Sequence, residues 1–416
     1  MSRVLFLLVS FFPAVITAYA GGKPGAKQGS MDLTRISWQR NTTVELNGEW
    51  EFYWEELLTP KDFEHREAGQ VFIQLPSLWN DQQLTAQSYA TYRLRVYIND
   101  NAGSLALLAP NVYTSYRLFI DGELRAQDGV VSEQKETAKP EWRGNLVFLA
   151  SPKDTIEIVL QVSNFDHYRG GVHKPFILGS AQGVLRNREI LIISDMLLVG
   201  GLLVLAASFL VFYSYRLNML QCLYFGLFCL FWAIRSLVTH VYVINHLYPT
   251  MEWSVALRIE YMALYISFLM AILFIHKVFH YNNRLLTALM VIINFLFIAS
   301  VMVLPTTFFT ALLNGFFTFA GVSLLNCFYV IVMAILRKQK EAWFSATGIL
   351  IGLIIFVVEF FGYNLFLPVN LVYLNLAYLT VFFVNGLVLI YGFVKAYQQV
   401  EQLESEKSAL FKTIRR

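Results

Sequence analysis

Long apolar segments dominate the second half of the chain. They begin near Ile190 and end near Tyr397, and a more polar region precedes them. Each segment is close to or above the roughly 20 residues that a helix needs to cross about 30 Å of hydrocarbon. We expect the spans at 190–214, 218–238, 253–277, 285–304, 308–336, 343–364 and 371–395. This pattern predicts an all-α seven-helix transmembrane bundle over residues 190–395.

The first half of the chain shows a period of two instead. Tyr92, Leu94, Val96 and Ile98 alternate with Arg93, Arg95 and Tyr97, and Ile156 to Val162 repeat the alternation. A period of two with one apolar face indicates a strand on a core. Asp121-Gly122 lies between two such runs and is typical of a tight type I′ hairpin turn. The region from 40 to 182 is therefore predicted to be an all-β sandwich.

Lysine and arginine predict how the spans are oriented. The loops around 239–252, 305–307 and 365–370 contain neither residue. The alternate loops are basic, through Arg216, Lys277, Arg284, Arg337, Lys338, Lys340 and Lys395. Because basic loops stay in the cytoplasm, the C-terminus is expected inside and the sandwich outside. An odd number of spans agrees with this orientation.

The N-terminus is predicted to be an export signal over residues 1–20. Arg3 precedes an apolar stretch from Val4 to Ile16, and Ala18-Tyr19-Ala20 has the form of a cleavage site. An uncleaved anchor is the alternative. Either reading places the sandwich outside the membrane, and together with the spans it predicts a multi-pass membrane protein.

Composition supports a membrane protein. The 416 residues are 56% hydrophobic and 15% charged, whereas soluble domains are about 25% charged. The net charge of +3 is too small to suggest direct binding of nucleic acid. The three cysteines, Cys222, Cys229 and Cys327, all lie in apolar spans, so the sandwich has no disulfide and must be held by its core.

Inside the predicted spans we expect buried charge at Arg235, Arg258, Glu260 and Glu359. Charge within a membrane is costly and is usually paired or functional. Either arginine could pair with either glutamate. Such a pair would lock helices together, couple a signal between them or form part of a transport path.

The last segment, residues 396–416, has a seven-residue repeat. One row contains Phe393, Val400, Lys407 and Ile414, and the other contains Ala396, Leu403 and Leu410. Such a pattern predicts a short coiled-coil stalk that is continuous with the last span and joins two copies of the chain. A single solvated helix is the alternative.

Several motifs in the first half resemble a known domain. They are Asn47-Gly48-Glu49-Trp50-Glu51-Phe52-Tyr53-Trp54, Leu75-Pro76-Ser77-Leu78-Trp79-Asn80, Tyr89-Ala90-Thr91-Tyr92-Arg93-Leu94-Arg95, Tyr116 to Gly122, Val162-Ser163-Asn164-Phe165 and Arg169-Gly170-Gly171. In this order they resemble the galactose-binding-like jelly-roll domain. With seven spans behind it, the chain resembles the bacterial seven-transmembrane receptors with diverse intracellular signalling modules. Ala90 stands where that family would have glycine.

The resemblance implies a sensor of an extracytoplasmic small molecule, with carbohydrate as one candidate. Aromatic side chains suit sugar faces, and amides and arginine suit hydroxyls. The ligand-binding candidates are Trp79, Asn80, Tyr89, Asn164, His167, Tyr168 and Arg169. The alternatives are that the tryptophan fills the core, that Asn164 shapes a turn, or that the ligand binds at the outer mouth of the bundle near His240, Tyr242 and His246.

No catalytic role is expected. The sequence contains no P-loop, HExxH or GxSxG motif, and neither a cofactor nor a metal site is predicted. Members of the family carry a histidine kinase, a cyclase or a DNA-binding module after the stalk. None of their motifs precedes Arg416, so we expect a shortened receptor or one that signals through a cytoplasmic partner.

The alternative function is a transporter or a transport accessory with a carbohydrate-binding domain. Transporters often break their helices near the bilayer midplane with proline and glycine. In the second half the prolines are Pro249, Pro305 and Pro368, all in the predicted outer loops. This placement favours an unbroken bundle and therefore the receptor.

Overall fold

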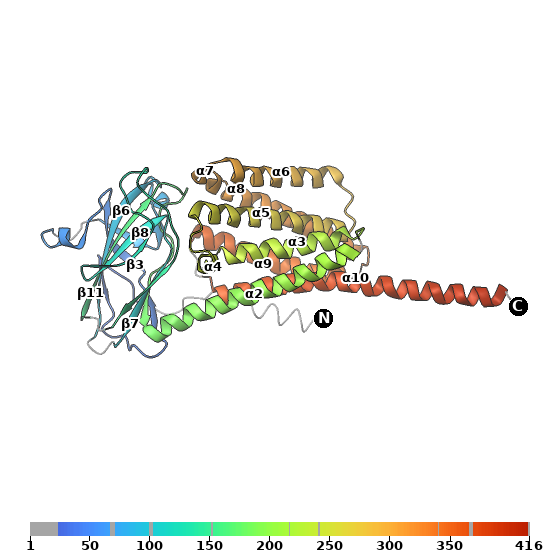
Figure 1. Cartoon of the computed structure of the whole chain (residues 1–416), viewed down its shortest axis with the longest axis horizontal. Helices are drawn as coiled ribbons and strands as arrows, with labels where there is room; N and C mark the ends of the chain where they lie inside the picture. The colour runs from blue at the N-terminus through green and yellow to red at the C-terminus, as the bar shows by residue number, and fades with distance from the viewer. Residues whose placement is uncertain are drawn as a thin grey trace.

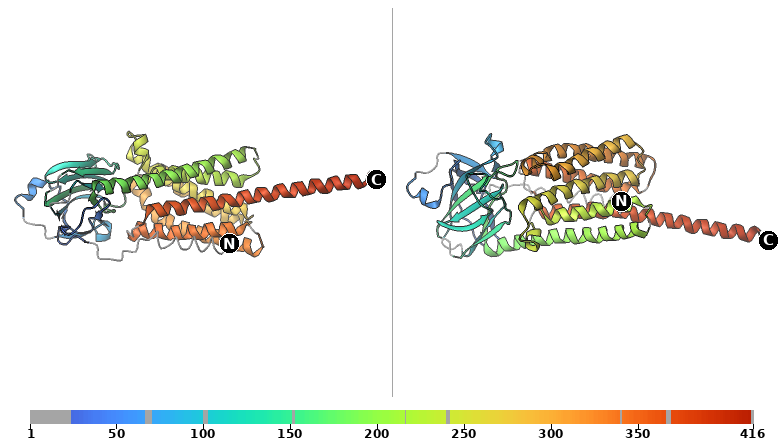
Figure 2. Two further views of the ribbon diagram at one scale, coloured as in Figure 1. Left: turned by 90° about the horizontal axis from the view of Figure 1, so that it is seen from below. Right: turned by 45° about the horizontal axis from the view of Figure 1, so that its top comes forward.

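The computed structural model describes residues 24–66, 71–99, 103–150, 153–215, 217–239, 242–339, 341–365 and 369–414. The predicted export signal, residues 1–20, lies outside these ranges. A β-sandwich lies at one end of a bundle of long helices, and the last helix extends well beyond the other end (Figure 1). Both views in Figure 2 show the same order of sandwich, bundle and extended helix. The predicted fold, a sandwich followed by apolar helices, is confirmed.

The sandwich has two main sheets. The larger sheet has the order β4-β3-β6-β11-β8-β9, with β1 paired in parallel to β6, and the smaller has the order β10-β7-β13-β2. A short pair joins β5 and β12. The strands are β1 (Ser30–Asp32), β2 (Thr43–Glu45), β3 (Gly48–Trp54), β4 (Phe72–Leu75), β5 (Ser77–Leu78), β6 (Ser88–Tyr97), β7 (Leu105–Ala109), β8 (Ser115–Ile120), β9 (Glu123–Asp128), β10 (Asn145–Leu149), β11 (Thr155–Asn164), β12 (Gly171–Val172) and β13 (Ile177–Ser180).

The strand pattern read from the sequence holds in the structure. The apolar row of β6 and that of β11 are buried between the sheets, where they pack with Trp50, Tyr116 and Phe176. The hairpin between β8 and β9 turns at Asp121 and Gly122, whose φ angles are 50° and 89°. Positive φ at both positions is what a type I′ turn requires, so this prediction is confirmed.

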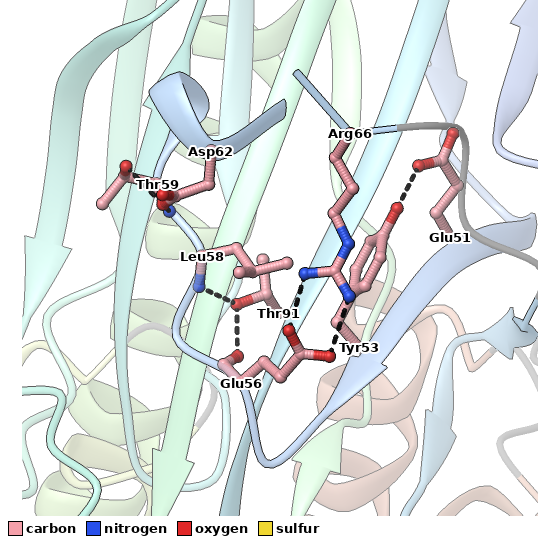
Figure 3. A network of polar contacts seen from close by, with 8 residues as sticks. All are labelled: Glu51, Tyr53, Glu56, Leu58, Thr59, Asp62, Arg66 and Thr91. Atoms are coloured by element: carbon pink, nitrogen blue, oxygen red, sulfur yellow. Dashed lines mark hydrogen bonds and ion pairs between the residues drawn. The ribbon is translucent and has the colours of Figure 1, made fainter. Parts of the chain in front are cut away.

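The outer face of the larger sheet is covered by its own chain. Arg66 donates to Glu56 at 2.6 and 3.1 Å, and the Tyr53 hydroxyl donates to Glu51 at 2.8 Å (Figure 3). Thr91 of β6 donates to the Glu56 carbonyl at 2.7 Å and ties this segment to the sheet. These contacts hold the segment 53–66 against this face of the sheet.

Seven of the described helices are long and apolar enough to span a membrane. These are α2 (Ala181–Tyr215), α3 (Leu220–Leu237), α5 (Trp253–Val278), α6 (Arg284–Val303), α8 (Leu313–Leu336), α9 (Ala342–Leu365) and α10 (Leu371–Ile414), with the short helices α4 (Ile244–Leu247) and α7 (Thr306–Ala311) between them. Large apolar side chains on the outside of the bundle are exposed, as a surface in contact with lipid requires; on α6 they include Leu289, Ile292, Phe295 and Leu296.

Two helices extend beyond the apolar segments that predicted them. Helix α2 begins at Ala181, directly after β13, and the Ser180 hydroxyl accepts from the Gly183 amide at 3.2 Å as its N-cap. No residue separates the last strand of the sandwich from the first membrane helix. Helix α10 runs for 44 residues without a break, through the last span and the predicted stalk.

Candidate functional site

The loop after β11 connects the sandwich to the bundle. The side-chain amide nitrogen of Asn164 lies 2.8–3.0 Å from the carbonyl oxygens of Ala86, His167 and Arg169, so it fixes the shape of this loop. At the tip of the loop, the Tyr168 amide donates to the Thr310 hydroxyl of α7 at 3.2 Å. The loop is thus rigid on the sandwich side and attached to the bundle on the other.

Arg169 makes the strongest of these contacts. Its guanidinium donates to the Tyr363 carbonyl at 2.6 Å and to the Asn364 side-chain oxygen at 3.0 Å, and it lies 3.3 Å from the centre of the Tyr363 ring. Carbonyls at a helix C-terminus lack partners within the helix and carry partial negative charge. Arg169 therefore caps the end of α9 from another domain.

A second contact is aromatic. Trp142 of the sandwich lies with its ring 5.4 Å from that of Tyr242 and 5.3 Å from that of Trp253, both of the bundle. Asn245 donates to the Trp142 carbonyl. Leu78 and Tyr113 join Trp142 in one apolar cluster with α5, α7 and α8. The two domains therefore share a small core rather than a hinge.

Three stacked rings lie where the sandwich faces the bundle. Tyr113 is between His167, at 4.2 Å, and His173, at 4.3 Å between ring centres. Burial lowers the pKa of His167 to about 3 and lowers the pKa of His173 well below its usual range. Both imidazoles are therefore neutral at ordinary pH and contribute no charge to the site.

A cavity of about 830 Å³ begins below these rings and continues into the bundle. Its outer part is lined by residues of the sandwich, including Arg169, His173 and Lys174. Its inner part follows α5 from Leu257 to Ile275 and is also lined by α3, α8, α9 and α10. This volume lies within the range of about 300–1,000 Å³ that is typical of small-molecule sites. The cavity is the candidate ligand site.

The charged residues predicted inside the spans separate into three environments. Arg235 lies 4.0 Å from Glu359 and joins α3 to α9, so one of the predicted pairs is present. Arg258 donates to the carbonyl of Val301 on α6 and to that of Leu304, the residue directly after this helix. Glu260 lines the cavity. The arginines therefore hold helices together, and Glu260 faces the candidate site.

Sequence reasoning missed one charged residue in the first span. Asp195 is buried in α2 and accepts a hydrogen bond from the side chain of Asn375 on α10 at 2.6 Å. Asn375 also donates to the Ser194 hydroxyl at 3.0 Å. An aspartate five residues into an apolar span is a visible signal. The contact joins the first membrane helix to the last.

The predicted ligand-binding residues of the sandwich do not form one group. The indole of Trp79 is buried in the core and donates to the Tyr92 hydroxyl at 2.5 Å, and Asn80 accepts from the Gly170 amide at 3.1 Å. Tyr89 is half-buried on β6, and Tyr168 is 41% exposed. His167 and Arg169 line the cavity. Their role in binding a ligand stays a prediction, with these two best placed for it.

The stalk residues lie on the part of α10 beyond the bundle. Val400 is 54% exposed and Leu403 is 64% exposed in the single chain. The side chains of Leu410 and Ile414 lie outside the described residues. Of the residues suggested at the outer mouth, Tyr242 lines the cavity, whereas His240 and the side chain of His246 lie outside the described residues.

The fold and the site define a multi-pass membrane protein whose β-sandwich is docked on a seven-helix bundle. Residues 192–395 match the family model described as 7TM diverse intracellular signalling, so the seven-helix region is similar to that family. The resemblance found in the sequence is confirmed for this region. No curated protein matches the chain.

Among solved structures, glycoside hydrolases are similar to part of the chain. A β-glucuronidase of an uncultured Clostridium sp. is 15% identical with a TM-score of 0.26, over 34% of this chain and 29% of that one. The β-glucuronidase of Faecalibacterium prausnitzii is 17% identical with a TM-score of 0.27, over 33% and 31%. The β-galacturonidase of Eisenbergiella tayi is 14% identical with a TM-score of 0.25, over 36% and 26%. The chain thus spans less than a third of the length of each.

Proposed function

We propose that the protein is a receptor that senses an extracytoplasmic small molecule and passes the signal through the bundle to a dimeric cytoplasmic stalk. The observation that carries the proposal is that one helix, α10, both lines the cavity and continues into the predicted stalk. Leu374, Tyr378 and Phe382 of α10 line the cavity, and the same helix continues to Ile414. A ligand in the cavity would therefore contact the element that forms the stalk.

The connections at the outer end support the same relay. The sandwich is joined to α2 without a linker and to α9 through Arg169. A ligand that binds more tightly to one arrangement of these contacts would shift the equilibrium of the bundle towards that arrangement. The free energy of this shift cannot exceed the difference in the ligand's binding free energy for the two arrangements. The placement of lysine and arginine supports an orientation with the sandwich outside. The match to the family model supports placing the protein in a bacterial inner membrane.

A dimeric stalk explains the exposed apolar row on α10. Val400 and Leu403 occupy the two core positions of the heptad, and two parallel copies would bury both side chains. The proposal involves a cytoplasmic signalling module or partner, and it assigns no catalytic step to the described residues.

Cysteine crosslinking in native membranes tests the stalk. Leu403→Cys should form a disulfide dimer quickly, whereas Ser405→Cys should react slowly because that position lies on the opposite face of the heptad. The native cysteines are buried and provide a low background. Equal rates for the two variants would contradict a dimeric stalk, and a ligand that changes the Leu403→Cys rate would identify the stimulus.

Transport stays an alternative because the cavity follows α5 as far as Ile275, near the inner end of that helix. Uptake of radiolabelled sugars into vesicles that contain the protein distinguishes the two functions. Accumulation above that of empty vesicles would favour transport over the receptor.

A further inference from the structure

The lining of the cavity changes from charged to apolar along its length. Near the sandwich it contains Lys174, Arg188 and Glu260, and deeper in the bundle most of its side chains are aromatic or aliphatic. The deep residues include Phe228, Leu264, Phe268, Phe316, Phe356 and Phe382. A sugar, with hydroxyls on every side, would leave many of them without partners in the deep part. The gradient matches a molecule that is polar at one end only.

The length of the cavity points to an extended occupant. Leu257 and Ile275 of α5 both line it, and a separation of 18 positions corresponds to roughly 27 Å along a helix that rises about 1.5 Å per residue. This is of the order of the length of a long-chain fatty acid. The deep walls come from five different membrane helices, so an apolar chain would lie along the axis of the bundle.

The charges at the mouth favour an anion. Five cationic side chains line the cavity, namely Arg143, Arg169, Lys174, Arg188 and Arg235, against three carboxylates, namely Glu45, Glu260 and Glu359. The excess is two positive charges. Arg169 is bound to α9, Arg143 is paired with Glu141 and Arg235 lies beside Glu359. Lys174 and Arg188 are the cations that remain for a ligand.

Lys174 has the environment expected of a group that meets an anion. Its side chain is accessible, yet enough protein surrounds it that burial lowers its pKa, while attraction to Glu260 and Asp195 opposes this effect. Among the described residues, none forms a hydrogen bond or an ion pair with Lys174. An ammonium in a cavity of low dielectric gains strongly from a carboxylate or phosphate partner.

From this geometry we infer that the cavity binds a single-chain amphiphile with an anionic head group. The head lies at Lys174 below the sandwich, and the apolar tail extends along α5 among the aromatic residues. The inference rests on the proposed receptor function and names the class of its ligand. Since Tyr378 and Phe382 would contact the tail, chain length as well as head group should determine how α10 responds.

Binding of a photoreactive palmitic acid, with a diazirine on its chain, tests the inference on the full chain in lipid nanodiscs. We expect labelling of peptides of α5 or α10 that line the cavity, and competition by palmitate. Hexadecanol and hexadecyltrimethylammonium have the same tail with a neutral or cationic head and should compete at least about tenfold more weakly. Equal competition by the three compounds, or labelling of outer surfaces only, would overturn the inference.

Two variants with matched controls locate the site. Lys174→Gln removes the charge at the mouth and should weaken labelling about tenfold, whereas Lys135→Gln changes an exposed lysine of the sandwich and should have no effect. Gly352→Leu fills the cavity from α9, where a Cβ meets nothing within 4 Å, so the fold should tolerate it while labelling is lost. Gly315→Leu on α8 is equally open but does not line the cavity. Unchanged labelling in both Lys174→Gln and Gly352→Leu would overturn the inference.

The route of entry is distinguished by where the probe is added. Probe supplied in the outer buffer on an albumin carrier and probe mixed into the nanodisc lipid should label at different initial rates. The faster arm identifies external water or the bilayer as the source. If no labelling occurs in either arm but a soluble ligand still alters crosslinking at Leu403→Cys, the amphiphile is refuted and the receptor function stands.

Discussion

Arg169 shows how one side chain can join two domains. Its guanidinium binds the end of α9 through two hydrogen bonds and a stacked ring, and the residue is only 6% exposed. Hydrogen bonds to a charged group contribute about 1.5–3 kcal/mol, and a partly desolvated cation–π contact adds about 1 kcal/mol. The stability of the docked arrangement should therefore depend strongly on this residue.

We expect Arg169→Ala to weaken docking of the sandwich by about 2–4 kcal/mol. Hydrogen exchange in nanodiscs should then become faster in the loop 164–170 and at the end of α9, with little change inside the sheets. Arg125→Ala is the control, because Arg125 also donates to a carbonyl but its contacts with Glu123 and Phe148 lie within the sandwich. Equal exchange in the two variants would show that Arg169 does not hold the domains together.

The sequence singled out the loop residues Asn164, His167, Tyr168 and Arg169 but not their partners. Thr310 and Tyr363 are 142 and 194 residues away from the loop residues that they contact. No local pattern encodes contacts at such separations. Trp79 could equally have been a core residue or a sugar-binding residue, because both roles use an aromatic ring, and its position in the core is settled only by packing.

At the level of helices and strands, the sequence predicted which elements exist better than where they end. Apolar runs mark the part of a helix that contacts lipid or core, so all seven spans were found. Helix α10 continues past its apolar run because glutamate, glutamine, lysine and alanine are good helix formers in water. Similarly, α2 starts at Ala181 in a polar stretch, where the Ser180 cap and the preceding strand define the start.

The contact between α3 and α9 gives a test of helix pairing. Arg235→Gln leaves Glu359 without its cation in a site of low dielectric and should destabilise the bundle by about 1–3 kcal/mol. The double variant Arg235→Gln/Glu359→Gln removes both charges and should recover much of that loss. Thermal unfolding of the single and double variants in nanodiscs measures the coupling. Strictly additive losses would mean that the two residues act independently.

For the whole molecule, the central feature is the apolar interface between the β-sandwich and the membrane bundle. Tyr113 and Trp142 are buried only because Trp253 and its neighbours cover them. The pattern of apolar residues predicts a sandwich and a bundle, but it does not predict which edge of the sandwich faces the membrane. That choice depends on side chains that are far apart in the sequence, such as Trp142 and Trp253, meeting in three dimensions.

A sandwich prepared alone, from residues 24–182, should expose this patch. We expect the fragment to fold on its large core and to bind a hydrophobic dye, because Trp142 loses its partners. Trp142→Gln should reduce dye fluorescence, whereas Phe148→Gln should reduce it less, since Phe148 is 48% exposed in the whole protein and lies outside the interface cluster. A fragment that binds no dye would contradict the proposed docking surface.

Because α10 is unbroken, the number of residues in the stalk sets the direction in which its end faces relative to the bundle. Each residue of a helix advances by about 100°, so one residue inserted after Ser405 would turn Ile414 by that angle relative to the bundle. Seven inserted residues would restore the direction to within about 20°. The activity of the cytoplasmic module or partner should therefore vary periodically with the number of inserted residues. It should recover with every seventh inserted residue and should not decline smoothly with stalk length.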